Sequence, residues 1–267
     1  MPATAVTSAL RTHWPEYLIE AAGLGAFMLS ALGFTLLLEH PASPLRVALP
    51  DAFLRRALIG CAMGATLIAL VYNPLGQRSG AHFNPVFTLT FLRLGRVAPA
   101  DALFYAAAQF AGAAAAVALL ALGCAMALGD ARVHYAVTTP GADGVAAAFA
   151  GEVGIAFAQM LLVLLVSNTK RLNKYTGVFA AVGVAIYITL EAPLSGMSMN
   201  PARTLASALG ARDFTALWLY FTAPLIGMLL AAELYLRAAG ARRVHCAKLH
   251  HDNTQPCPFR CGWGAAT

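Results

Sequence analysis

Two stretches of this sequence place an Asn-Pro pair four residues after a glycine, between long apolar segments. The first runs from Gly80 to Val86, the second runs from Gly196 to Ala202, and both continue into Thr-Leu. Asn is a favoured helix N-cap, and Pro is favoured at the first helical position because its missing N–H would have no partner there. Each Asn-Pro pair therefore predicts the start of a helix.

Both predicted helices are too short to cross a bilayer, because Gly95 and Gly210 follow within about ten residues and a crossing needs roughly 20. Two half-helices at corresponding places in two halves of a chain indicate a pore at the repeat interface. Their N-termini carry partial positive charge and free N–H groups, to which the amides of Asn84 and Asn200 add donors. Such a pore admits neutral molecules with lone pairs and repels cations. Alternatively, both Asn residues serve only as helix caps.

The composition excludes a soluble protein. Of the 267 residues, 59% are hydrophobic and 11% are charged, whereas soluble domains carry about 25% charged residues. We therefore expect an integral membrane protein, whose first apolar segment is long enough to direct its own insertion. No basic patch with interleaved aromatic residues indicates nucleic acid as a partner. No nucleophile–base pair or cofactor motif indicates an enzyme.

The predicted fold is all-α, with six transmembrane helices and two re-entrant half-helices in an inverted repeat. A lead-in at 1–16 precedes a channel domain at 17–238, with halves at 17–128 and 145–238, and a Cys/His-rich tail follows at 239–267. Three spans in each half insert the halves in opposite orientations, so the half-helices meet near the midplane. The predicted spans are 17–38, 53–72, 101–128, 145–166, 176–190 and 214–237, and the half-helices are 84–94 and 200–209.

The distribution of Lys and Arg predicts the orientation. If both termini are cytoplasmic, the inner segments hold twice as many basic residues as the outer ones, as expected for cytoplasmic loops. The first outer segment is the exception, because it contains Arg46, Arg55 and Arg56. We expect a protein of the cell membrane, inner or plasma, with a cytoplasmic lead-in and tail.

The paired motifs and their flanking spans resemble those of the aquaporin, or major intrinsic protein, family over about residues 15–238. Asn200-Pro201-Ala202, followed by Arg203, matches the family pattern. The first motif, Asn84-Pro85-Val86, has Val where the family usually has Ala, which adds bulk near the midplane and leaves the pore width open there. The resemblance implies an aquaporin-like channel in which four identical subunits each enclose a pore.

The resemblance also implies roles for buried polar residues. Arg203 would be the constant donor of the outer constriction; the alternative is a structural Arg paired with Glu191. Glu20 and Glu152 occupy matching places in the two halves, where such acids accept hydrogen bonds from the half-helix loops; proton carriage is the alternative. His82 corresponds to a histidine of the inner vestibule, or is simply a packed side chain.

The remaining filter residues are assigned by counting from the motifs. They are Gly64 in the second span, Ile188 in the fifth span, and Met197 before Arg203. A gap in the count would move these positions by a residue. Water-selective family members usually have a bulky aromatic residue at the second-span place and His at the fifth-span place. Gly and Ile predict a wider, more apolar opening of the kind found in aquaglyceroporins.

These features predict a passive channel for water and for glycerol-sized solutes, neutral metalloid acids or hydrogen peroxide, which excludes ions and protons. Transport would need no cofactor, and the partners would be the lipid bilayer and three further copies of the chain. The alternatives are a water-selective aquaporin, a non-conducting membrane-junction protein, and a metal-regulated protein with a closed pore.

The tail is unusually rich in metal-binding residue types. Three Cys and three His lie within residues 245–261, and thiolate and imidazole are the ligands of tetrahedral zinc sites. The spacing predicts Cys246, His250, Cys257 and Cys261 as a zinc ligand set. The alternative is a disordered tail with reactive thiols.

Overall fold

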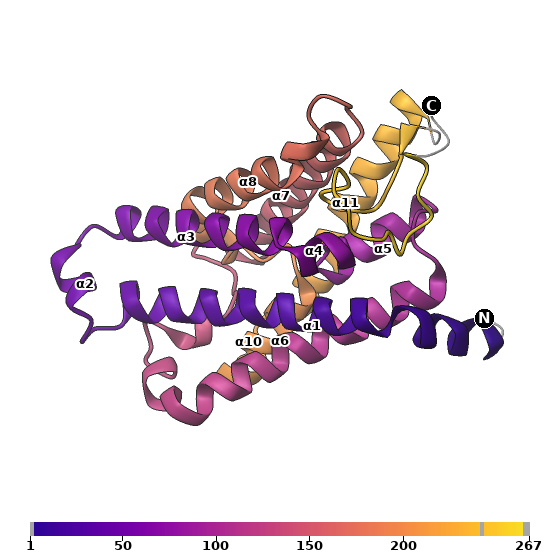
Figure 1. Ribbon diagram of the computed structural model, residues 1–267. Coiled ribbons are helices and arrows are strands. Elements are labelled where there is room, and N and C mark those ends of the chain that lie inside the picture. Colours follow the sequence, from indigo (N-terminus) through magenta and orange to yellow (C-terminus); the bar gives the residue numbers. More distant parts are fainter. Residues whose placement is uncertain (1–2, 241–242, 264–267) are drawn as a thin grey trace.

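The computed structural model describes residues 3–240 and 243–263, in which all regular structure is helical (Figure 1). The second half of the chain repeats the helix order of the first. The first half contains α1 (Ala3–Glu39), α2 (Pro44–Ala48), α3 (Ala52–Tyr72), α4 (Pro74–Ser79), α5 (Pro85–Arg93) and α6 (Pro99–Leu128), and the second contains α7 (Gly144–Ser167), α8 (Thr176–Leu190), α9 (Ala192–Ser195), α10 (Pro201–Ala211) and α11 (Leu217–Ala239), with 3-10 turns at His134–Ala136 and Asn173–Tyr175.

Six of these helices form the membrane-spanning body. Within the described residues, α1, α3, α6, α7 and α11 are long and apolar enough to cross a bilayer. Helix α8 has 15 residues without a charge, or about 22 Å at 1.5 Å per residue, and it packs along α3. The predicted fold of six spans and two half-helices, α5 and α10, is thereby confirmed.

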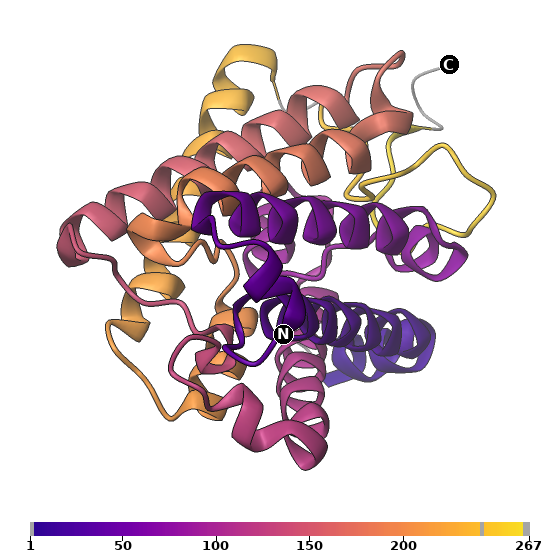
Figure 2. The same cartoon turned by 90° about the vertical axis from the view of Figure 1, so that its left-hand side faces the viewer.

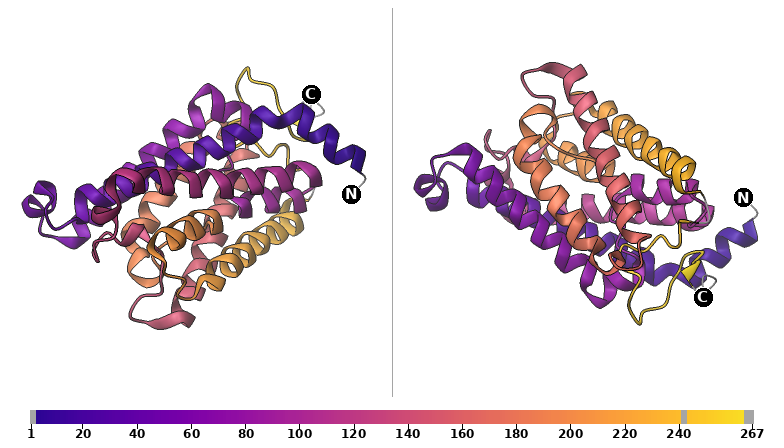
Figure 3. Two further views of the ribbon diagram at one scale, coloured as in Figure 1. Left: turned by 90° about the horizontal axis from the view of Figure 1, so that it is seen from below. Right: turned by 90° about the horizontal axis from the view of Figure 1, so that it is seen from above.

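The inverted repeat is visible in the packing. Helix α1 packs along α6 as α7 packs along α11, and each half-helix contacts the last span of both halves. Figure 1 shows α1 between α3 and α6, and Figures 2 and 3 show the same bundle from the side, from below and from above. The two halves are therefore interlocked through α5 and α10 rather than merely placed side by side.

Small residues allow the closest helix crossings, as is common for helices in membranes. A Cβ atom on Gly112 of α6 would overlap the backbone of Ala21 in α1, and one on Gly227 of α11 would overlap the backbone of Val153 in α7. These two glycines lie on corresponding helices of the two halves. The same close crossing therefore stabilises both helix pairs.

The structure extends the first helix beyond the predicted boundary. The segment predicted as a lead-in before the first span is the start of α1, which begins at Ala3. Its polar side chains find partners: Arg78 forms an ion pair with Glu16 at 2.9 Å, and Tyr17 donates a 2.7 Å hydrogen bond to Asp101. Short helices α2 and α4 likewise occupy segments predicted as loops.

We expect Gly112→Ala to destabilise the protein by about 1–3 kcal/mol, because the added methyl group forces α1 and α6 apart. Gly123→Ala on the same helix is the matched control, since no atom lies within 4 Å of its added Cβ. That control should gain up to about 1 kcal/mol of helix propensity. Thermal unfolding in detergent measures both; equal shifts for the two variants would contradict a close crossing at Gly112.

Candidate functional site

The two half-helices begin at the asparagines of the paired motifs. Asn84 Oδ1 accepts from the Val86 N–H at 2.9 Å, and Asn200 Oδ1 accepts from the Ala202 N–H at 3.1 Å and from the next N–H at 3.3 Å. Both asparagines are thus N-caps. The motif Pro residues occupy the first position of each half-helix.

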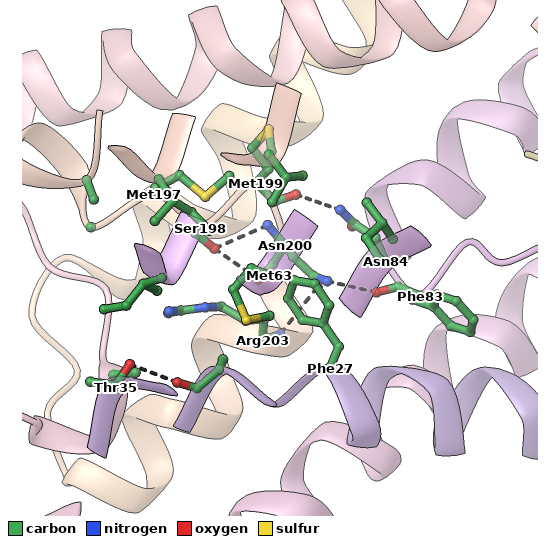
Figure 4. A pocket seen from close by; sticks show the side chains of 18 of the residues that line it. Phe27, Thr35, Met63, Phe83, Asn84, Met197, Ser198, Met199, Asn200 and Arg203 are labelled. Atoms are coloured by element: carbon green, nitrogen blue, oxygen red, sulfur yellow. Dashed lines mark hydrogen bonds between the residues drawn. The ribbon is translucent and has the colours of Figure 1, made fainter. Parts of the chain in front are cut away.

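The same two side chains also connect the halves (Figure 4). Asn84 Nδ2 donates to the Met199 carbonyl at 2.8 Å, and Asn200 Nδ2 donates to the Phe83 carbonyl at 2.8 Å. Each amide has two N–H groups, so one remains beyond this cross-connection. Since both asparagines line the central cavity, capping and a place in the cavity wall coexist.

The cavity encloses about 450 Å³. It extends from Arg132 and Val133, in the connection between the two halves, past the asparagines to Leu249 in the tail. Most of its wall is apolar, with a few polar groups that converge on it. The apolar wall residues include Phe27, Ile59, Met63, Leu67, Val184, Ile188 and Met197.

Arg203 supplies a guanidinium to this wall, as do Arg56 and Arg132. It lies on the first turn of α10, and Figure 4 shows its side chain extending away from Asn84 and Asn200. Its Nη1 is buried and makes no hydrogen bond. The ion pairs found in the described part of the chain do not include Arg203, so the alternative pairing with Glu191 is not seen. Arg203 therefore lines the cavity without an ion-pair partner among the described residues.

The loops that precede both half-helices share an unusual backbone. Ala81 and Phe83 in the first loop, and Met197 and Met199 in the second, have φ between 45° and 57°. This left-handed region is costly for residues with a side chain and persists only where surrounding contacts enforce it. The matching positions show that the two loops have the same backbone conformation.

Glu152 holds the second loop in this conformation. Its carboxylate accepts from the N–H groups of Ser198 at 2.6 Å and Met199 at 2.8 Å, and from the Ser195 hydroxyl at 2.8 Å. Tyr220 also donates to the Ser195 carbonyl, at 2.6 Å. Backbone donors that face away from the pore thereby obtain an acceptor in a region without water.

Glu20 makes the same bonds to the first loop. It accepts from the N–H groups of His82 at 3.0 Å and Phe83 at 2.6 Å, from the Ser79 hydroxyl, and from Gln109 Nε2 at 2.8 Å. Glu20 and Glu152 are both fully buried, and neither lines the cavity. This arrangement favours a supporting role for both acids over proton carriage. Gln109, which the sequence analysis did not identify, is a further hydrogen-bond donor to Glu20.

His82 is packed on all sides. Its ring stacks on Phe91 at 5.4 Å and on Phe259 of the tail at 5.0 Å, between ring centroids. Nδ1 lies 3.0 Å from the Thr88 hydroxyl, and Nε2 lies 2.9 Å from the Ala247 carbonyl. His82 also borders the cavity, so it combines the two predicted alternatives, but both ring nitrogens are already occupied by the protein.

The structure corrects one counted filter position. Gly64 does not line the cavity; it faces α8, where an added Cβ would lie 3.0 Å from the Ala181 carbonyl oxygen. Its neighbour Met63 lines the cavity instead, together with Ile188, Met197 and Arg203. The count from Asn84 back to α3 passes through α4, whose turns could not be derived from spacing alone, and is wrong by one residue.

Val86, the departure from the usual motif, does not narrow the cavity. Its side chain is 1% exposed, belongs to the hydrophobic core and is absent from the cavity wall. The extra bulk relative to Ala is therefore accommodated by packing behind the half-helix.

The tail brings four metal-binding side chains together. Ligand atoms of Cys246, His251, Cys257 and Cys261 all lie within 4.8 Å of one another, so this cluster could hold a metal ion. The prediction that His250 belongs to the set is wrong: its ring packs against Tyr72 with centroids 4.8 Å apart. Adjacent histidines point in different directions, and spacing alone could not choose between them.

The thiols of the cluster are electrostatically coupled. Cys246 and Cys257 have sulfur atoms 3.5 Å apart, and a hydrogen bond from Cys246 lowers the pKa of Cys257 to about 4. The same bond, together with burial, raises the pKa of Cys246. Ionisation of the pair therefore favours Cys257 over Cys246, and thiolate is the form that binds metals.

Comparisons with known proteins agree with this geometry. The family model described as "Major intrinsic protein" matches residues 11–235. Aquaporin NIP6-1 of Arabidopsis thaliana is 35% identical over 181 residues, which cover 67% of this chain and 57% of that protein. Aquaporin NIP1-3 of Oryza sativa subsp. japonica is 36% identical over 174 residues, which cover 64% and 58%. The chain thus spans less than two thirds of the length of these relatives.

A solved structure shares the fold. The aquaglyceroporin from Plasmodium falciparum matches with a TM-score of 0.69 at 18% sequence identity, and the match covers 85% of this chain and 97% of that one.

We expect Glu152→Leu to destabilise the second loop, because it leaves two buried N–H groups without an acceptor at about 1–3 kcal/mol each. Glu152→Gln should lose less, since its amide oxygen still accepts. The control is Glu233→Gln on α11, whose carboxylate is part-exposed and pairs with Arg93. The unfolding temperature should be lowest for Glu152→Leu, higher for Glu152→Gln and highest for the control. Equal stability of all three variants would argue against the supporting role.

Proposed function

This chain belongs to the major intrinsic protein family, and on that basis we propose that it is a passive transmembrane channel for water and small uncharged solutes. One observation carries the proposal. Two half-helix N-termini, capped by Asn84 and Asn200, meet at one cavity whose wall also contains the free guanidinium of Arg203. A passing molecule with lone pairs finds donors at both places.

The same groups account for the exclusion of ions. Each half-helix N-terminus carries about half a positive charge, and Arg203 adds a full one where little water is available to screen it. A cation or hydronium ion entering the cavity meets repulsion at both places. The asparagine amides turn donors toward the midplane, because each Oδ1 is directed at the N–H groups of its own helix.

For selectivity we propose a filter made of Met63, Ile188, Met197 and Arg203. Three apolar side chains face one strong donor, so a solute can place its carbon atoms on the wall and its hydroxyls on Arg203. Glycerol-sized solutes, neutral metalloid acids and hydrogen peroxide fit this chemistry as well as water does. A water-selective pore is less well supported, because neither an aromatic residue nor His occupies the two positions.

We further propose that both termini are cytoplasmic in the cell membrane and that four copies assemble. The basic residues of the first outer segment do not oppose this orientation strongly, because Arg55 and Arg46 pair with Glu39 at 3.0 and 4.0 Å. Apolar side chains on the outside of the bundle, such as Leu122 at 86% and Met126 at 94% exposure, suit a lipid or subunit contact.

For the tail we propose a Zn²⁺ ion bound by Cys246, His251, Cys257 and Cys261. Ligands of a tetrahedral zinc ion with 2.3 Å Zn–S bonds lie about 3.8 Å apart, close to the separations within this cluster. Three thiolates and Zn²⁺ leave one negative charge. Lys248 is buried beside the cluster, and its Nζ donates to the Gln255 carbonyl at 3.0 Å, so its ammonium can balance that charge.

The channel is tested in proteoliposomes containing a chelator on both sides, so that the metal state of the tail is defined. Stopped-flow light scattering should show protein-dependent entry of water, glycerol, urea and a neutral metalloid acid. A pH gradient should decay no faster than in empty liposomes, because the positive midplane excludes protons. Entry of none of these solutes would support a non-conducting protein, and protein-dependent proton leak would overturn the exclusion mechanism.

The filter is tested by Met63→Phe combined with Ile188→His. The variant should lose glycerol permeability about tenfold or more while retaining water, since one lost apolar contact is worth about 1–3 kcal/mol and the opening also narrows. Ile188→Leu, which keeps the wall apolar, is the control and should behave like the unmodified protein. If the unmodified protein passes water but excludes all larger solutes, the water-selective alternative takes over.

The zinc site is tested by metal analysis of protein purified without chelator. We expect about one zinc per chain, lost in Cys257→Ser because three remaining ligands bind far more weakly. Cys124→Ser, which removes a thiol within α6, should retain the metal, and so should His250→Ala. Metal-free protein, or loss on His250→Ala but not on His251→Ala, would count against the proposed ligand set.

A further inference from the structure

The tail after α11 is packed into the protein rather than free in solution. Val244 and Ala247 are completely buried, Cys246 and Lys248 are 2% and 3% exposed, and Leu249 is 4% exposed. The segment lies outside the spans, where a polar, solvated chain would be the ordinary expectation. Figure 1 shows it, in yellow, looping back beside α4 and α5. Burial of this kind indicates a specific docking site.

That docking site is the entrance to the cavity. The Leu249 N–H donates to the Gly80 carbonyl at 3.1 Å, and the Ala247 carbonyl lies 2.9 Å from His82 Nε2. Gly80 and His82 belong to the loop that leads into the first half-helix. Leu249 itself is part of the cavity wall, so an apolar side chain from the tail stands at one end of the pathway.

A second tail residue packs against the loop at this entrance. Phe259 stacks on the His82 ring with centroids 5.0 Å apart and planes inclined by only 3°. A Cβ atom on Gly80 would overlap the Phe259 ring, so this glycine is needed for the ring to approach. Leu249 and Phe259 thus hold the entrance loop from two sides.

The residues of the metal-binding cluster alternate with these two residues along the chain. Cys246 immediately precedes Ala247–Leu249, and Cys257 and Cys261 flank Phe259 two residues away on either side. An ion bound to these ligands would join the segment that carries Leu249 to the segment that carries Phe259. Without it, the sulfur contacts between those segments are the 3.5 Å Cys246–Cys257 pair and the 3.0 Å approach of His251 Nε2 to Cys261 Sγ.

Other contacts between the tail and the body are hydrogen bonds. Arg260 N–H donates to the Arg96 carbonyl at 2.9 Å, Arg96 Nη1 donates back to the Arg260 carbonyl at 3.1 Å, and the His245 N–H donates to Asn168 at 2.7 Å. Such bonds contribute about 0.5–1.5 kcal/mol each. They are strong enough to direct docking and weak enough for the tail to leave when it is no longer cross-linked.

We propose that the tail is a metal-locked gate: an ion on Cys246, His251, Cys257 and Cys261 holds Leu249 and Phe259 over the cytoplasmic entrance, and removal of the ion opens the pore. The proposal rests on the zinc site and on the channel function proposed above. Binding of the ion favours the docked tail because the docked conformation holds all four ligand atoms within 4.8 Å of one another, and a ligand shifts an equilibrium by the ratio of its affinities for the two states.

The experiment uses the full chain in proteoliposomes, with either Zn²⁺ or a chelator present on both sides. Glycerol permeability should be up to about tenfold higher with the chelator, because a tenfold preference of the ion for the docked state lowers the open fraction by at most that factor. Cys257→Ser should be open under both conditions. Cys124→Ser should respond to Zn²⁺ as the unmodified chain does.

A second variant separates the effect of the Leu249 side chain from that of the metal site. Leu249→Ala keeps all four ligands, so it should still bind about one zinc per chain yet conduct glycerol in the presence of Zn²⁺. Leu75→Ala on α4, whose side chain is 60% exposed, is the matched control and should remain closed. If Leu249→Ala does not open the zinc-loaded protein, Leu249 is not the side chain that closes the pathway.

The outcomes distinguish the underlying proposals. Equal permeability with and without Zn²⁺, in protein that carries the metal, overturns the gate and leaves the channel and the zinc site intact. Absence of bound zinc overturns the gate together with the site. Absence of any solute flux in the unmodified chain, Cys257→Ser and Leu249→Ala alike overturns the channel and hence the gate.

Discussion

The structure depends on how two helices can end in the middle of a membrane. A helix N-terminus leaves backbone N–H groups without intrahelical partners, and the bilayer core offers no water to satisfy them. Here Asn84 and Asn200 accept from the first free N–H groups, and Glu20 and Glu152 accept from those of the preceding loops. The remaining donors face the cavity, so the requirement for partners and the capacity to conduct arise from the same backbone.

This solution explains why the two halves behave as a unit. The amide of each asparagine donates to a carbonyl in the opposite loop, and each half-helix packs on the last span of both halves. A displacement of one half would therefore break the hydrogen bonds that both asparagines donate across the midplane. The result is a rigid midplane, which is what a pathway needs if it is to discriminate between molecules of similar size by fixed donors.

Much of this could be predicted from sequence, because it follows from local rules. The Asn-Pro caps, the six apolar spans, and the matching positions of Glu20 and Glu152 need only helix chemistry, span length and the repeat. Positions that depend on rotation about a helix axis could not be derived in this way. Met63 rather than Gly64 lines the cavity, and a shift of one residue turns a side chain by about 100° around its helix.

The tail shows a different limit of sequence reasoning. Its Cys and His content indicates a metal site, yet the choice between His250 and His251 depends on which neighbour packs against Tyr72. Nothing in the local pattern indicates that the segment docks at the pore loop, because docking is decided by Gly80, which leaves room for Phe259. The docked tail places the ligand cluster next to His82 and next to the end of the cavity. Chemistry at the cluster can act on the pathway because the intervening residues are packed against one another without a flexible link.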